Sequence, residues 1–214
     1  AESPEGVAAP VPRAGRWVSR RRGALGFTGL FRGKPVSIQS TGIGVSSFLI
    51  YAHELLDFHG VKTLIRTGTC GGLNAEAPLR SLVISQSVRA ESADSGQGFG
   101  LYAAAGPDPA LLALALRQAE GLGIEHRAGL TICSDIFYHP RGRARYAEAM
   151  AMGALAVDME TSALYRISAH FGARALSLLN VVDHIVTGEQ TDYCERQALF
   201  TDMTRLALEV AVGD

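Results

Sequence analysis

Cysteine, unbalanced charge and long apolar runs are all scarce in this chain of 214 residues. Its 3 cysteines, Cys70, Cys133 and Cys194, are an odd number at wide spacings with no histidine at a metal-binding interval, which predicts reduced thiols in the cytoplasm and no metal site. The 20 basic and 21 acidic residues nearly cancel, so no electrostatic footprint for nucleic acid is present. No apolar run approaches the roughly 18 residues of a membrane span. We therefore expect neither nucleic acid nor a membrane as a partner.

The amino-terminal segment differs from the rest of the chain. Residues 1–15 are rich in proline, alanine and glycine, contain no initiator methionine and show no signal-peptide pattern, so we expect the chain to begin inside a longer gene product. Glycines recur over residues 23–29, which favours a strand or hairpin over a helix. Five arginines cluster within residues 13–22, and a solvated surface is the expected setting for most of them: Arg13, Arg16, Arg20, Arg21 and Arg22.

From Lys34 onward, short apolar runs alternate with helical patterns. The sequence predicts strands at 35–40, 63–67, 81–88, 127–133, 154–157 and 175–182, helices at 46–58, 109–122, 143–152, 160–171 and 195–212, a tight turn at 41–44 and a polar loop at 91–100. This alternation indicates a mixed central β-sheet with helices on both faces. The chain is 47% hydrophobic and has no linker, so we expect one α/β domain over residues 1–214.

Two carboxylates follow strand-like apolar runs, Glu160 after residues 154–157 and Asp183 after residues 175–182. Both are expected where strands open into a cleft, which is where α/β enzymes keep their chemistry. Glu160 has an ordinary alternative, because a negative charge also favours the start of a helix. Asp183 leaves a buried setting, which can raise its pKa and keep it protonated as an acid. Arg196 is either a helix-surface cation or a partner that folds back on Asp183.

The segment Arg66-Thr67-Gly68-Thr69 combines a cation, hydroxyls and glycine-freed backbone at one strand end. These are the groups that an oxyanion such as phosphate requires. On this segment alone, an arginine paired with a surface carboxylate is an equal alternative.

Three further features have ordinary interpretations. Phe137 and Tyr138 follow a buried strand, so core filling is their default, with a ring face for a planar heterocycle as the alternative. The segment Gly42-Ile43-Gly44 is more often a turn than a ligand site. We assign no histidine a catalytic role, although His184 lies near the proposed site.

Six segments nevertheless stand in one order along most of the chain: Arg22-Gly23-Ala24-Leu25-Gly26-Phe27-Thr28-Gly29, Ile65-Arg66-Thr67-Gly68-Thr69-Cys70-Gly71, Asp135-Ile136-Phe137-Tyr138, Val157-Asp158-Met159-Glu160, Val182-Asp183-His184-Ile185 and Glu195-Arg196-Gln197. Together they resemble the nucleoside phosphorylase family, specifically its hexameric bacterial purine nucleoside phosphorylases. The resemblance implies a mixed-sheet α/β fold and homohexamers built as trimers of dimers. It also implies reversible cleavage of purine nucleosides by phosphate to free base and ribose 1-phosphate, with phosphate as co-substrate and no cofactor.

The same resemblance implies a role for each matching residue. Arg66 and Thr69, with the backbone at Thr67 and Gly68, would bind phosphate, and Arg22 would reach the phosphate of the neighbouring subunit. Asp183, oriented by Arg196, would protonate N7 of the leaving purine. Met159 and Glu160 would hold the ribose hydroxyls and Phe137 would pack on the base, so that the nucleoside-binding residues are Phe137, Val157, Asp158, Met159, Glu160 and Val182.

The chain departs from the family pattern at two places. The family has an upstream strand, a Gly-Asp-Pro loop with a nearby arginine that clasps phosphate, and a histidine lent to the neighbour's ribose site. None of these is found in residues 1–21, and we expect them in a longer gene product. Val182 stands where these enzymes commonly have a small polar residue, so one hydrogen bond near the base is expected to be absent.

Three alternatives stay open. A uridine phosphorylase is suggested by residues 40–44 and Gly68-Thr69, but no glutamine-arginine pair follows Tyr138 to bind a pyrimidine. A methylthioadenosine or adenosylhomocysteine nucleosidase would use water and would not require Arg66. A non-catalytic relative would bind nucleosides without turnover. Asp183 is compatible with both 6-amino and 6-oxo purines, so the sequence leaves the preferred base open.

Overall fold

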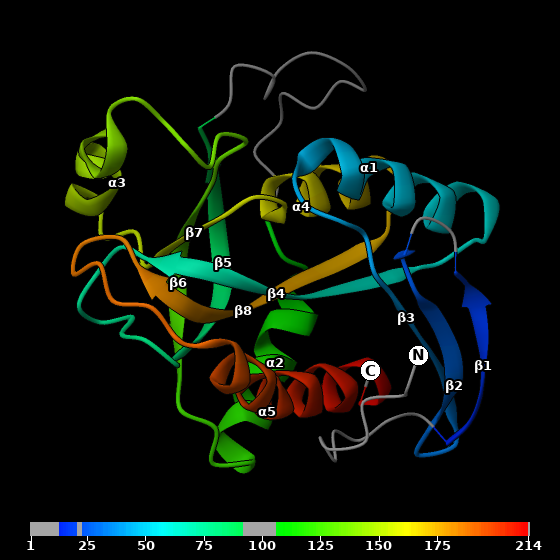
Figure 1. Cartoon of the computed structure of the whole chain (residues 1–214). Coiled ribbons are helices and arrows are strands. Elements are labelled where there is room, and N and C mark those ends of the chain that lie inside the picture. Colours follow the sequence, from blue (N-terminus) through cyan, green and yellow to red (C-terminus); the bar gives the residue numbers. More distant parts are fainter. Residues whose placement is uncertain (1–12, 21–22, 92–105, 214) are drawn as a thin grey trace.

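The computed structural model describes the backbone of residues 13–20, 23–91 and 106–213, and the side chains of these residues except 13, 14 and 193–200. Arg22 and most of the predicted loop at 91–100 lie outside the described residues. The described part contains a closed barrel of strands, helices on two sides of it, and a small separate sheet (Figure 1).

Five strands form the barrel in the order β4-β7-β6-β5-β8, with the bounds β4 (Thr63–Gly72), β5 (Leu82–Ala90), β6 (His126–Cys133), β7 (Ala156–Asp158) and β8 (Arg174–His184). β4 runs parallel to β8, and β6 runs parallel to both β5 and β7. The β4–β7 and β5–β8 pairs are antiparallel. The prediction of a mixed sheet is therefore confirmed, and its closure into a barrel is a feature that alternation of elements does not indicate.

Helices cover opposite sides of the barrel, as predicted (Figure 1). On one side lie α1 (Val45–His53), continued by a π-helical turn (Glu54–Phe58), and α4 (Thr161–His170); on the other lie α2 (Pro109–Gly121) and α5 (Tyr193–Val212). Leu111, Leu178 and Leu206 are fully buried in the core on the α2 and α5 side, and Phe48 and Leu164 are buried on the other. In the part of the chain that the structure describes, no helix combines the length and apolarity needed to cross a membrane.

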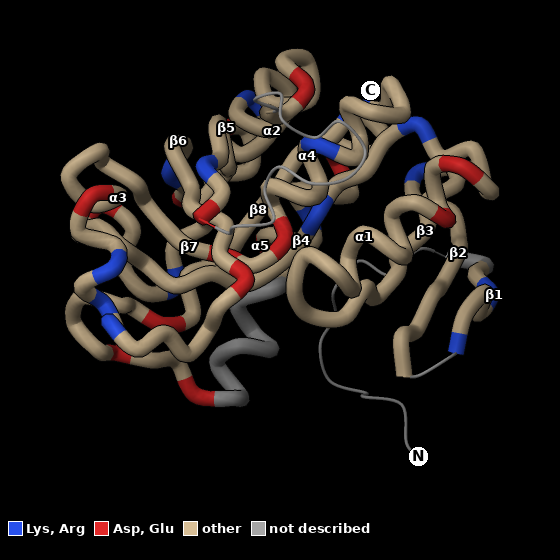
Figure 2. Tube along the Cα trace, turned by 90° about the horizontal axis from the view of Figure 1, so that it is seen from above, with Lys and Arg blue, Asp and Glu red and all other residues tan. Residues whose placement is uncertain are grey.

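A separate antiparallel sheet consists of β1 (Arg13–Ser19), β2 (Gly26–Phe31) and β3 (Lys34–Gln39). Arg32 and Gly33 form the turn between β2 and β3 with φ of 49° and 80°, the positive values that a two-residue hairpin turn requires. Arg32 also pairs with Glu209 of α5 at 2.6 Å, which ties the sheet to the barrel. The sheet lies at the opposite end of the molecule from α3 (Ala147–Ala151), as Figure 2 shows.

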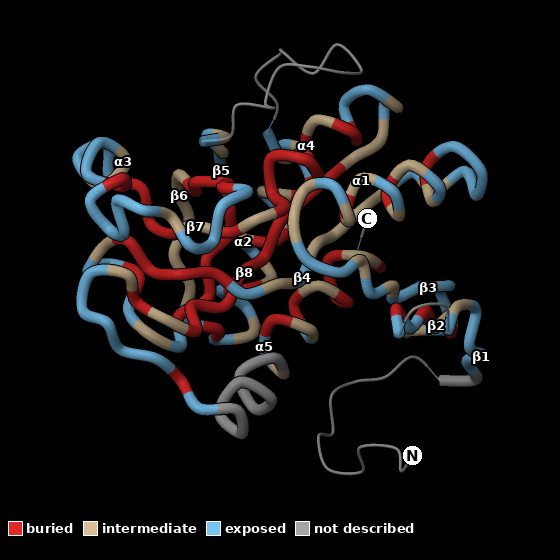
Figure 3. The backbone as a smooth tube through the Cα atoms, turned by 45° about the horizontal axis from the view of Figure 1, so that its top comes forward, coloured by how far each residue is buried: buried red, intermediate tan, exposed pale blue. Residues whose placement is uncertain are grey.

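The expected hairpin near residues 23–29 is confirmed by β2, and the solvated setting is confirmed for Arg16 and Arg20, which are exposed. Most other predicted elements are confirmed to within a few residues. The predicted helix at 143–152 is divided into a 3₁₀ turn (Gly142–Tyr146) and α3. β8 is buried from Ala175 to Val182 because the barrel interior and the helices cover its two faces (Figure 3).

The largest difference concerns β4, which was predicted to end near Thr67 and in fact continues to Gly72. Its glycines do not break the strand because neighbouring groups occupy the space of their absent side chains. A Cβ at Gly71 would lie 2.9 Å from Ile185, and one at Gly72 would lie 2.7 Å from the Ala77 carbonyl. Glycine here permits close packing rather than a turn. The extension places the expected phosphate segment within a barrel strand.

Candidate active site

A cavity of about 1130 Å³ opens where β4, β6, β7 and β8 end. Its lining comes from five stretches of chain: 42–43, 66–71, 134–146 in part, 157–160 and 182–190 in part. Every residue that the sequence predicted for the site lines this cavity, apart from Arg22 and Arg196. Arg22 lies outside the described residues, and Arg196 belongs to the part of α5 whose side chains are not described. The strand ends thus gather the predicted groups into one place.

A buried ion-pair network forms the wall of the cavity. Arg66 Nη2 donates to Glu160 Oε2 at 2.5 Å, and Arg66 Nε donates to Asp158 Oδ2 at 3.2 Å. The side chain of Arg66 is 11% exposed, and those of Glu160 and Asp158 are 6% and 0% exposed. The alternative of a surface ion pair is therefore wrong, because both partners are buried carboxylates. Charges in such a setting persist only when they are paired.

The position of Arg66 depends on the glycine two residues later in β4. A Cβ at Gly68 would lie 2.6 Å from the guanidinium carbon of Arg66, closer than atoms can approach. The guanidinium therefore lies directly over the backbone of Gly68. Gly68 was predicted to expose its backbone to an anion, and it also leaves the space that the Arg66 guanidinium occupies.

Asp158 is a buried anchor of this network. Its Oδ2 accepts hydrogen bonds from the backbone N–H groups of Glu160 and Thr161 at 3.2 and 3.0 Å and from the Thr161 hydroxyl at 2.7 Å. Asp158 thereby holds both Arg66 and the first turn of α4 in position. Its Oδ1 is buried and has no hydrogen-bond partner among the described residues. Asp158 fixes the direction in which the neighbouring Glu160 enters the cavity.

Glu160 stands at the start of α4, as its alternative interpretation expected, but its side chain does not cap the helix. Oε1 instead accepts from the Gly44 backbone N–H at 2.5 Å, while Oε2 accepts from Arg66. Burial raises the pKa of Glu160, and Arg66 opposes that rise. The contact between Gly44 and Glu160 was not predicted from the sequence. Its only signal was the glycine turn before α1, for which an ordinary turn was the favoured interpretation and a ligand site the alternative.

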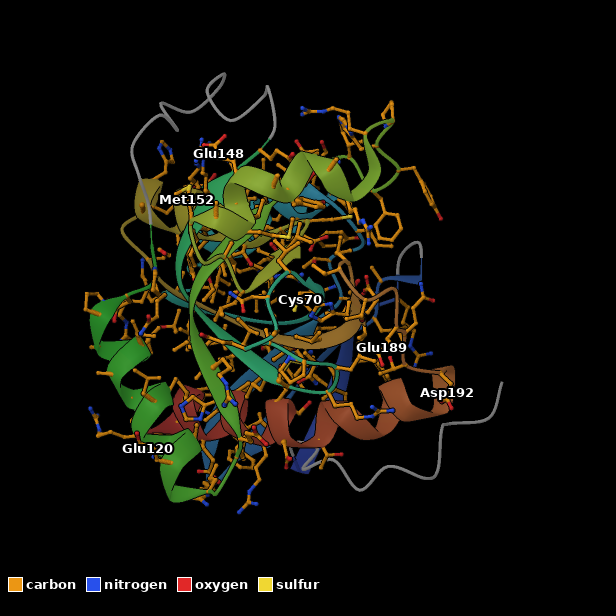
Figure 4. All side chains as sticks on the ribbon, turned by 90° about the vertical axis from the view of Figure 1, so that its left-hand side faces the viewer. Cys70, Glu120, Glu148, Met152, Glu189 and Asp192 are labelled. Carbon is orange, nitrogen blue, oxygen red and sulfur yellow. The ribbon has the colours of Figure 1, made fainter. Side chains whose placement is uncertain are left out.

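The remaining phosphate candidates lie beside Arg66. Thr67 and Thr69 are exposed and line the cavity with the backbone of Gly68. The next residue, Cys70, is buried among the barrel strands (Figure 4). Burial raises the pKa of its thiol well above the usual value, with Asp158 and Asp183 adding to the rise. Cys70 is therefore a neutral packing group rather than a nucleophile.

The aromatic pair expected in the core is not there, and that default is wrong. Phe137 is 69% exposed and Tyr138 is 90% exposed, and their rings meet edge to face with centroids 4.9 Å apart. Both line the cavity, together with the half-buried Val157 and Met159 and the buried Val182. The segment after β6 turns outward, so its rings stand at the mouth of the cavity. This is the setting of the alternative, a surface for a flat ligand.

Asp183 lies at the end of β8, opposite Gly71 of β4. A Cβ at Gly71 would lie 3.1 Å from Asp183 Oδ2, so the glycine leaves room for this carboxylate to lie over the strand. The adjacent His184 is buried; its Nδ1 accepts from the Thr187 backbone N–H at 3.3 Å, and its Nε2 lies 3.2 Å from the Asn74 carbonyl. Both ring nitrogens are therefore occupied by loop backbone. No catalytic role had been assigned to His184.

One cleft therefore brings together a buried arginine paired with two buried carboxylates, two exposed threonines and an aromatic mouth. Comparison with protein families matches residues 3–212 to the Phosphorylase superfamily, to which this chain belongs. A "Purine nucleoside phosphorylase DeoD-type" of Caldanaerobacter subterraneus subsp. tengcongensis is 44% identical over 89% of this chain and 82% of its own length. The proteins of that name from Geobacillus kaustophilus and Myxococcus xanthus are 42% and 43% identical, over 89% and 92% of this chain and 80% and 82% of their own lengths.

The ion-pair network predicts a pH dependence of stability. Because the pKa of Glu160 is raised in the folded protein, this group favours folding most at low pH, and the benefit is lost as the pH rises through its folded pKa. Replacing Arg66 removes the interaction that lowers this pKa. We expect Arg66→Met to raise the pKa of Glu160 further and to lose more stability than the wild type between acid and neutral pH. Urea unfolding at a series of pH values, with carboxyl NMR titration, measures both effects.

Arg89→Met is the matched control, because Arg89 pairs with Glu148 on the surface, where the two side chains are 52% and 73% exposed. It should follow the wild-type pH dependence. If Arg66→Met also followed it, the coupling of Arg66 to Glu160 would be excluded.

Proposed function

We propose that this chain catalyses the reversible phosphorolysis of purine ribonucleosides and deoxyribonucleosides to the free base and pentose 1-phosphate, as in purine salvage. The observation behind the proposal is that Arg66, paired with the buried Glu160, lines the same cavity as the exposed Thr67 and Thr69. An anion bound by Arg66 and these threonines would lie beside a sugar held by Glu160. The names of the relatives, which align over about four-fifths of their own length, support the same activity.

Phosphate would bind to Arg66 Nη1, to the Thr69 hydroxyl and to the backbone of Thr67 and Gly68. Two of the three guanidinium nitrogens of Arg66 face carboxylates, so the remaining one is available to an anion over Gly68. Arg22 of a neighbouring subunit would supply a second cation. Phosphate is the co-substrate, and we propose that the reaction uses no further cofactor.

The nucleoside would occupy the rest of the cavity. Glu160, fixed by Gly44 and Arg66, would accept hydrogen bonds from the ribose hydroxyls, and Met159 would pack against the sugar. The exposed ring of Phe137 would cover the base, and Val157 and Val182 would line the pocket around the base. We propose that Asp158 acts through its neighbours, by holding Arg66 and Glu160 in place.

The chemistry follows from where charge develops. As the glycosidic bond breaks, electrons pass to the purine, and a protonated Asp183 would donate its proton to N7 and neutralise the leaving base. Arg196 would orient this carboxyl. The sugar becomes positively charged at C1′, where the bound phosphate stabilises it and then forms the new C–O bond. The cleft contributes by holding base, sugar and phosphate in line.

We also propose a homohexamer, a trimer of dimers, in the cytoplasm. The separate β1–β3 sheet supports an interface between copies, because Trp17, Val18, Leu30 and Ile38 leave between 44% and 51% of their surfaces exposed. Apolar groups of this size on one sheet are typical of covered surfaces. Arg22 lies in the chain between β1 and β2, where it could reach a neighbour's cavity across such an interface.

The first test measures release of free base from inosine, adenosine and uridine, with and without phosphate, together with ribose 1-phosphate. We expect purine release that requires phosphate and yields ribose 1-phosphate in equal amount. Release without phosphate would indicate a nucleosidase, preference for uridine a uridine phosphorylase, and binding without turnover a non-catalytic relative. Each of these three results contradicts the proposal.

The general-acid role of Asp183 predicts a dependence on the leaving base. Asp183→Asn should lower kcat/KM for inosine on the order of a hundredfold, the usual scale for a lost general acid. It should affect 7-methylguanosine far less, since that base leaves without a proton at N7. Asp135→Asn, at an exposed carboxylate next to the aromatic segment, is the matched control. Equal losses on both substrates would refute the assignment.

The close approach of Arg66 to Gly68 predicts a selective loss of phosphate binding. A methyl group at Gly68 collides only with the end of a flexible side chain, so Gly68→Ala should fold but displace the guanidinium. We expect a higher KM for phosphate and a loss in kcat/KM on the order of a hundredfold, the usual effect of a misplaced catalytic group. Gly121→Ala, where a Cβ meets nothing within 4 Å, should leave the kinetics unchanged. An unchanged KM for phosphate in Gly68→Ala would contradict the assignment of Arg66 to the phosphate site.

A further inference from the structure

A second buried arginine lines the cavity away from the ion-pair network. Arg145, in the 3₁₀ turn after β6, has a side chain that is 2% exposed. Its Nη2 donates to the Ser134 hydroxyl at 2.7 Å and to the Tyr146 hydroxyl, and its guanidinium lies 4.4 Å from the centre of the Tyr146 ring. Its Nε lies 3.4 Å from Glu91 Oε2. These contacts fix the orientation of the guanidinium.

The third nitrogen of Arg145 has no such contact. Nη1 is buried and finds no hydrogen-bond partner among the described residues. Leaving a charged donor unpaired in the protein interior is costly. A built and oriented guanidinium with one unused nitrogen, in a residue that lines an open cavity, points to a ligand acceptor.

The barrel register relates Arg145 to the position proposed for a purine base. Asp183 pairs with Gly71, Gly71 pairs with Val157, and the Ser134 N–H donates to the Asp158 carbonyl at 2.9 Å. In the closed barrel, β8 and β6 are not neighbours, because β4 and β7 lie between them on one side and β5 on the other, so Asp183 and Ser134 stand across the end of the barrel from each other. A purine whose N7 faces Asp183 directs the far end of its six-membered ring, at C2, toward Ser134 and Arg145.

We propose that Arg145 determines base preference at C2, favouring purine nucleosides with a 2-oxo group over those with a 2-amino group. This inference rests on the proposed function. A 2-oxo group accepts hydrogen bonds, and the purine-2,6-dione ring ionises readily, so its anion is attracted to the guanidinium. A 2-amino group presents N–H donors to the donors of Arg145, which leaves both sets unpaired. A purine with hydrogen at C2 neither accepts a hydrogen bond from Arg145 nor opposes its donors, so its binding depends little on this residue.

The test compares nucleosides that differ only at C2: xanthosine with a 2-oxo group, inosine with hydrogen and guanosine with a 2-amino group. Wild-type protein should give a higher kcat/KM for xanthosine than for guanosine. Arg145→Met should lower kcat/KM for xanthosine by about tenfold to a hundredfold, the scale of one hydrogen bond to a charged group. The same variant should change kcat/KM for inosine little, and it should leave kcat/KM for guanosine unchanged or higher. Arg89→Met, a surface arginine outside the cavity, should preserve the wild-type order of substrates.

Equilibrium binding of the free bases xanthine, hypoxanthine and guanine tests the same order without turnover. If no nucleoside reacts with phosphate, the proposed function fails, while tighter binding of xanthine than guanine, lost in Arg145→Met, would still support the role of Arg145. Equal losses for all three bases in Arg145→Met would make it a purely structural arginine. Wild-type preference for guanosine over xanthosine, and for guanine over xanthine, overturns the inference even if the variant does not fold.

Discussion

The buried contact of Arg66 with Glu160 and Asp158 is the interaction on which the site depends. Removing one partner of such a group leaves an uncompensated charge in the interior, at a cost of about 3–5 kcal/mol. The contact also reaches beyond the three side chains, because Asp158 holds the first turn of α4 and Glu160 accepts from Gly44 at the start of α1. Barrel strand, helix starts and cavity wall therefore form one structural unit.

The charge of this network has a consequence for any anion that enters the cavity. One guanidinium faces two carboxylates, so the group is negative overall when both are ionised. A phosphate placed beside it is attracted by Arg66 and repelled by Glu160 and Asp158, and in a buried site these effects are large. A second cation near the phosphate would offset that repulsion. The repulsion therefore favours a shared active site in the proposed oligomer, with Arg22 supplied by a neighbour.

The sequence predicted most strands and helices because apolar periodicity and helix signals are local properties. It also placed Glu160, Asp183 and Arg66 in one cleft, since strand ends meet at one edge of a sheet. It did not predict the contact of Gly44 with Glu160 or the passage of Arg66 over Gly68, because both depend on packing between distant segments. For Phe137 and Tyr138, hydrophobicity alone made core filling the default over a ring face for a ligand, because hydrophobicity cannot distinguish a core ring from one at a cavity mouth.

The two halves of the cavity are built differently, and this difference bears on how the site distinguishes substrates. The side of Arg66, Asp158 and Glu160 is made of barrel strand and helix start, so a changed side chain there disturbs the fold. The side that follows β6 is a turn with exposed rings, where side chains can change at little cost to the barrel. Arg145 is the exception, since it is buried and joins Ser134 to Glu91. Because the same guanidinium orders the turn and faces the base, a change of base preference at this position must also replace the contacts that hold the turn.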